Sequence, residues 1–107
     1  MTPEGKIKRA ITAVLKNYGE DVYYHMSVPT GYGRSTLDYL GFCCGLGFAI
    51  EAKAPGEKPT ARQRAVIEEI EASGAAVFVI KNHQELANLE AWLRTLTEAR
   101  RVSRRNN

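Results

Sequence analysis

Two carboxylates and a lysine stand at a spacing that could form a metal site. Asp38 is followed after twelve residues by Glu51, and Lys53 comes two positions later. Two carboxylates that lie close together repel each other unless a cation neutralises them. Carboxylate oxygens are hard ligands, and they suit Mg²⁺ or Mn²⁺ better than zinc. The three residues therefore predict a divalent-cation site if the fold brings them together.

A short apolar segment leads into the second carboxylate. Residues 46–50 are apolar and follow a glycine, a pattern that indicates a buried strand. Because side chains alternate along a strand, Glu51 and Lys53 share one face, while Ile50 and Ala52 point the other way, into the core. A glutamate and a lysine at the end of such a strand are costly to bury unless they are paired or bind a metal.

The position of Asp38 depends on the turn that joins its own β-prone segment to the next strand. If residues 44–45 form a two-residue hairpin turn, Asp38 lies opposite Glu51. If residues 45–46 form the turn, Asp38 lies opposite Lys53 instead. Either register clusters the three side chains, because opposite Cβ atoms are about 5 Å apart. The same spacing also fits a salt-bridge cluster on a solvated sheet face.

The remaining pattern predicts an α/β fold. Helical spacing, capping residues and β-branched runs indicate, in chain order, a helix capped by Thr2 that ends at residues 17–19, strands over 22–28, 36–43 and 46–50, a helix from Thr60 to Ser73, a strand over 75–80, and a last helix that starts at Asn82 or His83. The second helix would connect two parallel strands as a β-α-β unit. We therefore expect a mixed β-sheet flanked by helices, in the order α-β-β-β-α-β-α.

Two further polar residues lie where they could reach the same site. Glu4 shares the apolar face of the first helix, so its carboxylate could point into the site, although the helix dipole also favours an acid in the first turn. Gln63 comes three residues after Thr60, which is the spacing of a capping box. The cap alone explains this glutamine, so the sequence leaves open whether Gln63 has a catalytic role.

Candidate nucleic-acid contacts lie in one loop and at the start of the second helix. The loop, residues 29–35, offers Tyr32 to stack on a base and Arg34 to bind a phosphate, and it could equally be a surface loop without a ligand. Arg62 and Arg64 open the second helix, where either side chain could face DNA.

The end of the chain combines an apolar stripe with a basic terminus. The stripe of the last helix consists of Leu86, Leu89, Leu93 and Leu96. Trp92 lies beside it and fits either the core or a dimer contact. Four arginines crowd the last eight residues: Arg100, Arg101, Arg104 and Arg105. We expect residues 100–107 to form a disordered tail after a domain of residues 1–99, and this tail would either contact nucleic acid or only be solvated.

Composition indicates a small single domain. The chain has 107 residues and a formal net charge of +3, which permits a polyanionic partner without requiring one. The adjacent Cys43 and Cys44 fit neither a zinc site nor a disulfide framework, which favours a reduced, intracellular protein. We expect no signal segment and no membrane span, because no apolar run is long enough.

The order of these motifs is similar to that of a known nuclease family. Asp-x(n)-Glu-x-Lys after an apolar strand resembles the motif of the PD-(D/E)XK nuclease superfamily. More particularly, residues 47–56, the glutamine helix after residues 58–63 and the glycine-alanine strand over 76–80 resemble the VRR-NUC domain, the virus-type replication-repair nuclease module. The likeness covers residues 4–96 and implies a restriction-endonuclease-like core.

The resemblance also implies roles for single residues. The metal ligands would be Glu4, Asp38, Glu51 and the carbonyl of Ala52. The catalytic residues would be Asp38, Glu51, Lys53 and Gln63. One departure is Leu37, which stands where the family pattern usually has proline. That proline shapes the backbone and does no chemistry, so the departure affects the motif more than the mechanism.

The activity implied is Mg²⁺- or Mn²⁺-dependent hydrolysis of phosphodiester bonds in branched or flapped DNA. Members of this size resemble Holliday junction resolvases that act as homodimers in DNA repair, in the cytoplasm or nucleoid of a bacterial or phage-infected cell. Three alternatives remain. They are a non-catalytic nucleic-acid-binding module, a restriction or end-processing nuclease with the same core, and a protein-interaction domain with a salt-bridged sheet.

Overall fold

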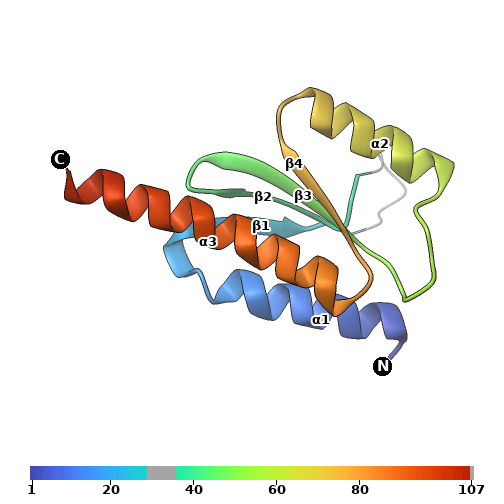
Figure 1. Ribbon diagram of the computed structural model, residues 1–107. Coiled ribbons are helices and arrows are strands. Elements are labelled where there is room, and N and C mark those ends of the chain that lie inside the picture. Colours follow the sequence, from blue (N-terminus) through green and yellow to red (C-terminus); the bar gives the residue numbers. More distant parts are fainter. Residues whose placement is uncertain (29–35, 107) are drawn as a thin grey trace.

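A computed structural model describes residues 1–28 and 36–106 of the chain (Figure 1). Its elements are α1 (Pro3–Lys16), the 3₁₀ turn η1 (Gly19–Asp21), β1 (Val22–Met26), β2 (Tyr39–Cys43), β3 (Leu46–Ala52), α2 (Ala61–Ala72), β4 (Ala76–Ile80) and α3 (His83–Arg105). Across the described residues the expected class is confirmed, since the fold is α/β with a four-stranded mixed sheet flanked by helices.

The sheet has the strand order β1-β2-β3-β4. The first three strands pair antiparallel in turn, whereas β3 and β4 run parallel. Helix α2 connects the parallel pair, as the β-α-β pattern predicted. Strand β3 therefore has a partner strand on both sides, and its carboxyl end lies between those two strands at one end of the sheet.

A two-residue turn joins β2 to β3. Cys44 and Gly45 both have positive φ angles, 52° and 84°, which is the backbone of a type I′ hairpin turn. The resulting ladder pairs Tyr39 with Ile50. This is the first of the two registers that the sequence allowed, the one in which the two carboxylates face each other.

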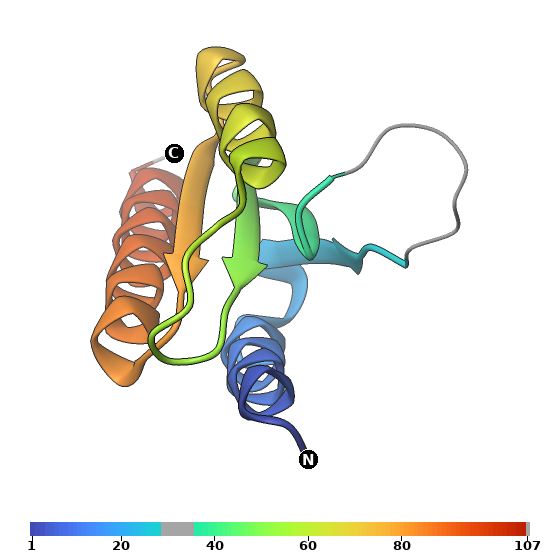
Figure 2. The ribbon, with the colours of Figure 1, turned by 90° about the vertical axis from the view of Figure 1, so that its right-hand side faces the viewer.

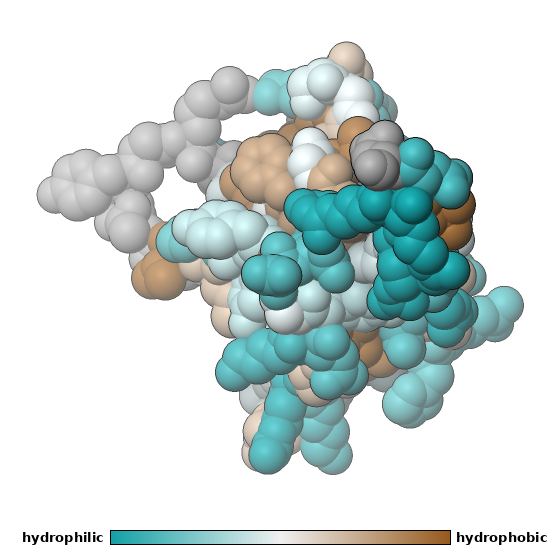
Figure 3. All heavy atoms as spheres, turned by 90° about the vertical axis from the view of Figure 1, so that its left-hand side faces the viewer, coloured by the Kyte–Doolittle hydropathy of each residue, from teal (hydrophilic) through white to brown (hydrophobic). Residues whose placement is uncertain are grey.

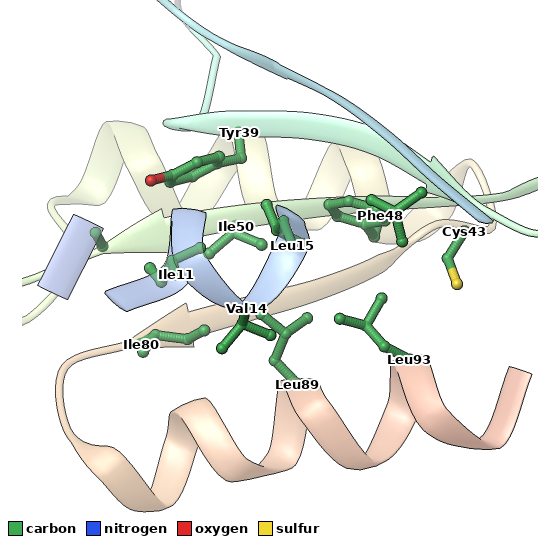
Figure 4. Close-up of a cluster of buried hydrophobic side chains, with 12 residues drawn as sticks. Ile11, Val14, Leu15, Tyr39, Cys43, Phe48, Ile50, Ile80, Leu89 and Leu93 are labelled. Carbon is green, nitrogen blue, oxygen red and sulfur yellow. The ribbon is translucent and has the colours of Figure 1, made fainter. Parts of the chain in front are cut away.

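Two helices cover one face of the sheet, and a third lies over the other. Helices α1 and α3 are on one side of the sheet and α2 is on the opposite side (Figure 2). The main core forms between the sheet and helices α1 and α3 (Figure 4). Its largest members include Ile11, Leu15, Tyr39, Phe48, Ile50, Ile80, Leu89 and Leu93. Because side chains alternate along each strand, the intervening residues point to the other face.

Each helix begins after a capping residue, and for α1 and α2 it is the residue that the sequence indicated. The side chains of Thr2 and Asn82 accept backbone hydrogen bonds from the first turns of α1 and α3, at 3.0 and 2.9 Å. Thr60 forms a reciprocal capping box with Gln63 at the start of α2. These caps determine where Glu4 and Gln63 lie relative to the sheet, because each sits in the first turn of its helix.

Helix α3 is longer than expected. It includes residues 100–105, which corrects the expectation that this segment is a disordered tail. The segment contains no glycine or proline to end the helix. Arg100 pairs with Asp21 at 3.5 Å, and Arg101 pairs with Glu98 at 2.9 Å. Arginines in a last turn also suit the negative end of the helix dipole. The last turns of α3 run past the end of the sheet (Figure 1).

Trp92 packs in the core, and neither of the two cysteines forms a disulfide. The Trp92 ring packs edge-on against Phe48 and Phe78, with ring centroids 5.9 and 5.5 Å apart, so it belongs to the core. Cys43 and Cys44 are both free. Among residues 1–28 and 36–106, no helix combines the length and hydropathy needed to cross a bilayer.

Candidate active site

Asp38 and Glu51 meet where strands β2 and β3 lie side by side. The backbone N–H of Asp38 donates to Glu51 Oε1 at 3.3 Å, and Asp38 Oδ2 accepts a hydrogen bond from the backbone N–H of Ala52 at 2.8 Å. The carbonyl of Asp38 accepts a hydrogen bond from the N–H of Ser27, just after β1, at 2.9 Å. Backbone groups thus hold both carboxylates in place.

Glu51 is a buried acid. Its side chain is only 5% exposed. Burial, together with the negative charge of Asp38, raises the pKa of Glu51 from its ordinary value of 4.5 to about 7. The charge of Lys53 and the hydrogen bond from the Asp38 backbone act in the opposite direction without cancelling the shift. A carboxylate in these surroundings would be stabilised in its charged form by a further cation.

Lys53 lies on the same sheet face as Glu51, as the alternation of side chains predicted. Its Nζ is 3.7 Å from Glu51 Oε2, and its side chain is 12% exposed. The backbone N–H of Lys53 donates to the carbonyl of Ile80 at 3.0 Å, which ties this residue to the end of β4. The lysine therefore provides a positive charge at a defined position beside the carboxylates.

Gln63 serves the helix cap and the site at the same time. Its Oε1 accepts a hydrogen bond from the Thr60 N–H at 2.9 Å, which completes the capping box. Its Nε2 donates to Glu51 Oε2 at 2.8 Å. Because a side-chain amide has a donor and an acceptor on separate atoms, the two contacts do not compete. The structure thus adds a contact with Glu51 to the cap that the sequence predicted.

The first helix contributes a glutamate and a lysine. Lys8 Nζ lies 3.4 Å from Glu4 Oε2 and 3.6 Å from Asp38 Oδ1. Partial burial lowers the pKa of Lys8, but the negative charges of Asp38 and Glu4 together raise it by more, so the net shift is upward. The Tyr39 hydroxyl donates to the carbonyl of Lys8 at 2.9 Å and so anchors α1 against β2. Lys8 thereby connects Glu4 to the site.

Lys8 is the site residue that the sequence reasoning missed. A signal was present, because Lys8 follows Glu4 by four residues and so lies on the same face of the helix. That signal is weak on its own, since pairs of this spacing are common on solvated helix faces. Only the packing of α1 against the sheet brings the ammonium group to Asp38.

The donor atoms suit a hard divalent cation, although they form no closed cage. Within residues 1–28 and 36–106, no three His, Cys, Asp or Glu side chains are grouped as a metal site. Mg²⁺ needs few protein ligands, however, because it usually keeps several waters and binds one or two carboxylates. Asp38 and Glu51 supply two carboxylates. The carbonyl of Ala52 faces the same edge, since the N–H and C=O of a strand residue point to the same side.

The other residues expected at the site divide into two groups. Arg62 and Arg64 are exposed in the first turn of α2, next to Gln63, and Arg64 Nη1 donates to the carbonyl of Pro59 at 2.8 Å. Tyr32 and Arg34 lie outside the described residues. The residues brought together are Glu4, Asp38, Glu51, Ala52, Lys53 and Gln63, with Lys8 in addition.

Comparisons with known proteins do not assign the chain to a family. A scan against models of protein families finds no match, and a search of curated proteins finds no significant relative. The chemistry of the site therefore rests on its own geometry.

Proposed function

We propose that this protein is a divalent-metal-dependent endonuclease that hydrolyses phosphodiester bonds in DNA. The observation that carries the proposal is the cross-strand pair of Asp38 and Glu51, with Lys53 beside it. A carboxylate with a perturbed pKa next to a second carboxylate and a lysine is an arrangement that is common in catalytic sites.

The balance of charge supports a bound cation. Three carboxylates, those of Glu4, Asp38 and Glu51, lie near two ammonium groups, those of Lys8 and Lys53. When Glu51 is ionised, the carboxylates outnumber the ammonium groups, and a hard cation would offset the burial and repulsion that raise the pKa of Glu51. Mg²⁺ or Mn²⁺ would be held by Asp38, Glu51 and the carbonyl of Ala52, with Glu4 nearby.

A bound cation would polarise the phosphate and lower the pKa of a water molecule. The side chains of the chain itself would do the rest. Lys53 would stabilise negative charge that develops on the phosphoryl oxygens, because its compact charge can approach a phosphate closely. Gln63 would hold the Glu51 carboxylate in one orientation through Nε2. Arg62 or Arg64, in the first turn of α2, would bind a phosphate of the DNA backbone.

We further propose that the α/β core is restriction-endonuclease-like and that the preferred substrate is branched DNA, such as a Holliday junction, cut by a homodimer. This part of the proposal is supported by the similarity of the motif order to the VRR-NUC domain.

A second candidate is a nucleic-acid-binding module without catalysis. One observation favours it: Lys8 and Lys53 already pair with the carboxylates, as they would in a purely structural network. The two candidates differ in whether the carboxylates bind a metal. A binding module has no need of Asp38 or Glu51 to contact DNA.

The first prediction separates the two candidates. Asp38→Asn and Glu51→Gln should each abolish Mg²⁺-dependent cleavage and weaken Mg²⁺ binding measured by calorimetry, while the protein still folds. Glu57→Gln is the matched control, because Glu57 is an exposed glutamate in the segment after β3. A panel of junctions, flaps, splayed arms and plain duplex identifies the substrate. Substantial cleavage in excess chelator would contradict the proposal.

A further inference from the structure

The sheet face that carries the candidate active site also carries exposed aromatic side chains. Along β2 and the residue just before it, Asp38, Leu40 and Phe42 point to one face, because side chains alternate. The pairing of β1 with β2 places Tyr23 opposite Phe42 and His25 opposite Leu40. Both residues of β1 therefore share the face of Asp38.

The part of this sheet face that β1 and β2 form is open to solvent. Tyr23 is 71% exposed, Phe42 is 55% exposed and Leu40 is 36% exposed. His25 is exposed as well. Helix α2, which covers this side of the sheet, packs on β4, at the far edge from β1. Two large aromatic side chains at paired positions of neighbouring strands that remain exposed to water indicate a binding surface.

The aromatic pair lies close to the acidic residues. At the rise of a β-strand, Phe42 is about 13 Å from Asp38 along β2. This distance corresponds to a few nucleotides of a DNA strand. A strand with one phosphate at Asp38 and Glu51 would therefore extend over Leu40 towards Phe42 and Tyr23, if it followed β2.

Aromatic rings on an open sheet bind unpaired bases by stacking. Every base has a π-face, so such stacking tolerates any sequence, and four-stranded sheets with exposed aromatic residues use it to bind single strands. Paired bases in a duplex are stacked on one another and cannot lie flat on the sheet. The chemistry of the surface therefore selects a strand with unpaired nucleotides.

We infer that Tyr23 and Phe42 form a stacking platform for unpaired nucleotides of the DNA strand whose phosphate lies at Asp38 and Glu51. The inference rests on the proposed function and specifies its substrate class: DNA with unpaired nucleotides beside the cleaved bond. A second copy of the chain is the competing occupant. Unpaired bases fit better, because a protomer seated on this patch would cover the open side next to the carboxylates.

The experiment measures the binding of fluorescein-labelled dT12 to the full chain by anisotropy, in EDTA so that no metal-dependent cleavage occurs. Tyr23→Thr and Phe42→Thr should each weaken dT12 binding by about 5- to 150-fold, as expected when one stacked ring is removed. Tyr23→Phe keeps the ring and should bind as the wild type does. Leu46→Thr is the control, since Leu46 is 52% exposed but lies opposite Cys43, on the other face. Affinity for a blunt duplex should not change in any variant, and thermal melting checks the fold.

The outcomes distinguish this inference from the proposed function. Loss of dT12 binding in the two threonine variants supports the platform even if no cleavage is found, in which case only the nuclease proposal fails. Unchanged dT12 binding in a chain that does cleave DNA overturns the platform and leaves the nuclease proposal intact. If sedimentation shows that Phe42→Thr separates a dimer into monomers, the face is an interface between copies and the platform is overturned.

Discussion

At the scale of single residues, Glu51 couples the stability of the metal-free protein to pH. Its pKa is raised to about 7 in the folded chain and is ordinary in the unfolded chain, so the folded state binds the extra proton between these values. Stability should therefore fall as pH rises from about 4.5 through 7, by up to about 3 kcal/mol.

The second prediction isolates this effect with Glu51→Gln. The variant lacks the titrating group, so without metal it should be more stable than the wild type at pH 8, and the difference should shrink towards pH 5. Chemical unfolding at both pH values measures it. Mg²⁺ should raise the melting temperature of the wild type at pH 8 and raise that of the variant less, because the variant binds Mg²⁺ more weakly. A stability difference that does not vary with pH would contradict the assignment.

The third prediction concerns the division of labour between metal and lysine. Lys53→Ala should reduce cleavage by about 10²–10³-fold, as for the removal of other electrostatic stabilisers, and should keep its affinity for Mg²⁺. Lys58→Ala is the matched control, because Lys58 is an exposed lysine five residues later. If Lys53→Ala loses metal affinity and keeps its turnover, the lysine does not act on the phosphate.

At the scale of elements, the end of α3 presents a basic surface far from the carboxylates. A hollow of about 270 Å³ is lined by Asp21, Thr97, Arg100, Arg101, Arg104 and Arg105. Figure 3 views the molecule from this end, where hydrophilic side chains gather on the protruding helix. Since these arginines lie on a helix and not on a disordered tail, their charges are held together and would face one stretch of phosphates.

The fourth prediction tests this surface. Replacing Arg104 and Arg105 by glutamine should weaken DNA binding and lower the slope of log K against log salt by about 0.9 for each phosphate that the variant no longer neutralises. The change should be the same for every DNA sequence, because phosphate contacts carry no sequence information. Arg94→Gln, on the same helix, serves as the control. An unaltered salt slope in the double variant would leave this end of α3 without a role in binding.

At the scale of the whole molecule, the number of sites matters. The described residues of one chain contribute one Asp38–Glu51 pair to a candidate site, whereas resolving a four-way junction takes two symmetric cuts. A two-fold dimer would supply two sites of matching polarity. Trp92, which the sequence suggested as either a core residue or a dimer contact, packs against Phe48 and Phe78 inside the protomer. A dimer interface must therefore lie on other surfaces.

The fifth prediction is that the chain forms a homodimer when it binds a four-way junction, and that it cleaves the junction faster than plain duplex. Sedimentation of the free protein and of its junction complex measures the first part, and cleavage rates measure the second. A monomer at micromolar concentration in both states would contradict the dimer. Equal rates on junction and duplex would leave only a general nuclease.

The sequence by itself determined the features that depend on neighbouring residues. Alternation along a strand puts Glu51 and Lys53 on one face, and the spacing of Thr60 and Gln63 makes a helix cap. The α/β class follows from similar local patterns, because a helix between two buried strands connects them in parallel. None of these features requires knowledge of distant contacts.

Only the tertiary structure decided how distant segments meet. The turns at residues 44–45 and 45–46 give registers that differ by two residues, since Asp38 lies opposite Glu51 in one and opposite Lys53 in the other. Both registers leave the same side chains on each face of the sheet, so alternation along the sequence cannot choose between them, and the folded sheet has the first. The contact of Lys8 with Asp38 depends on how α1 packs against the sheet. The helical end of α3 likewise gains from a pairing of Arg100 with Asp21, 79 positions apart. Local rules cannot specify such contacts, because they depend on the packing of the whole chain.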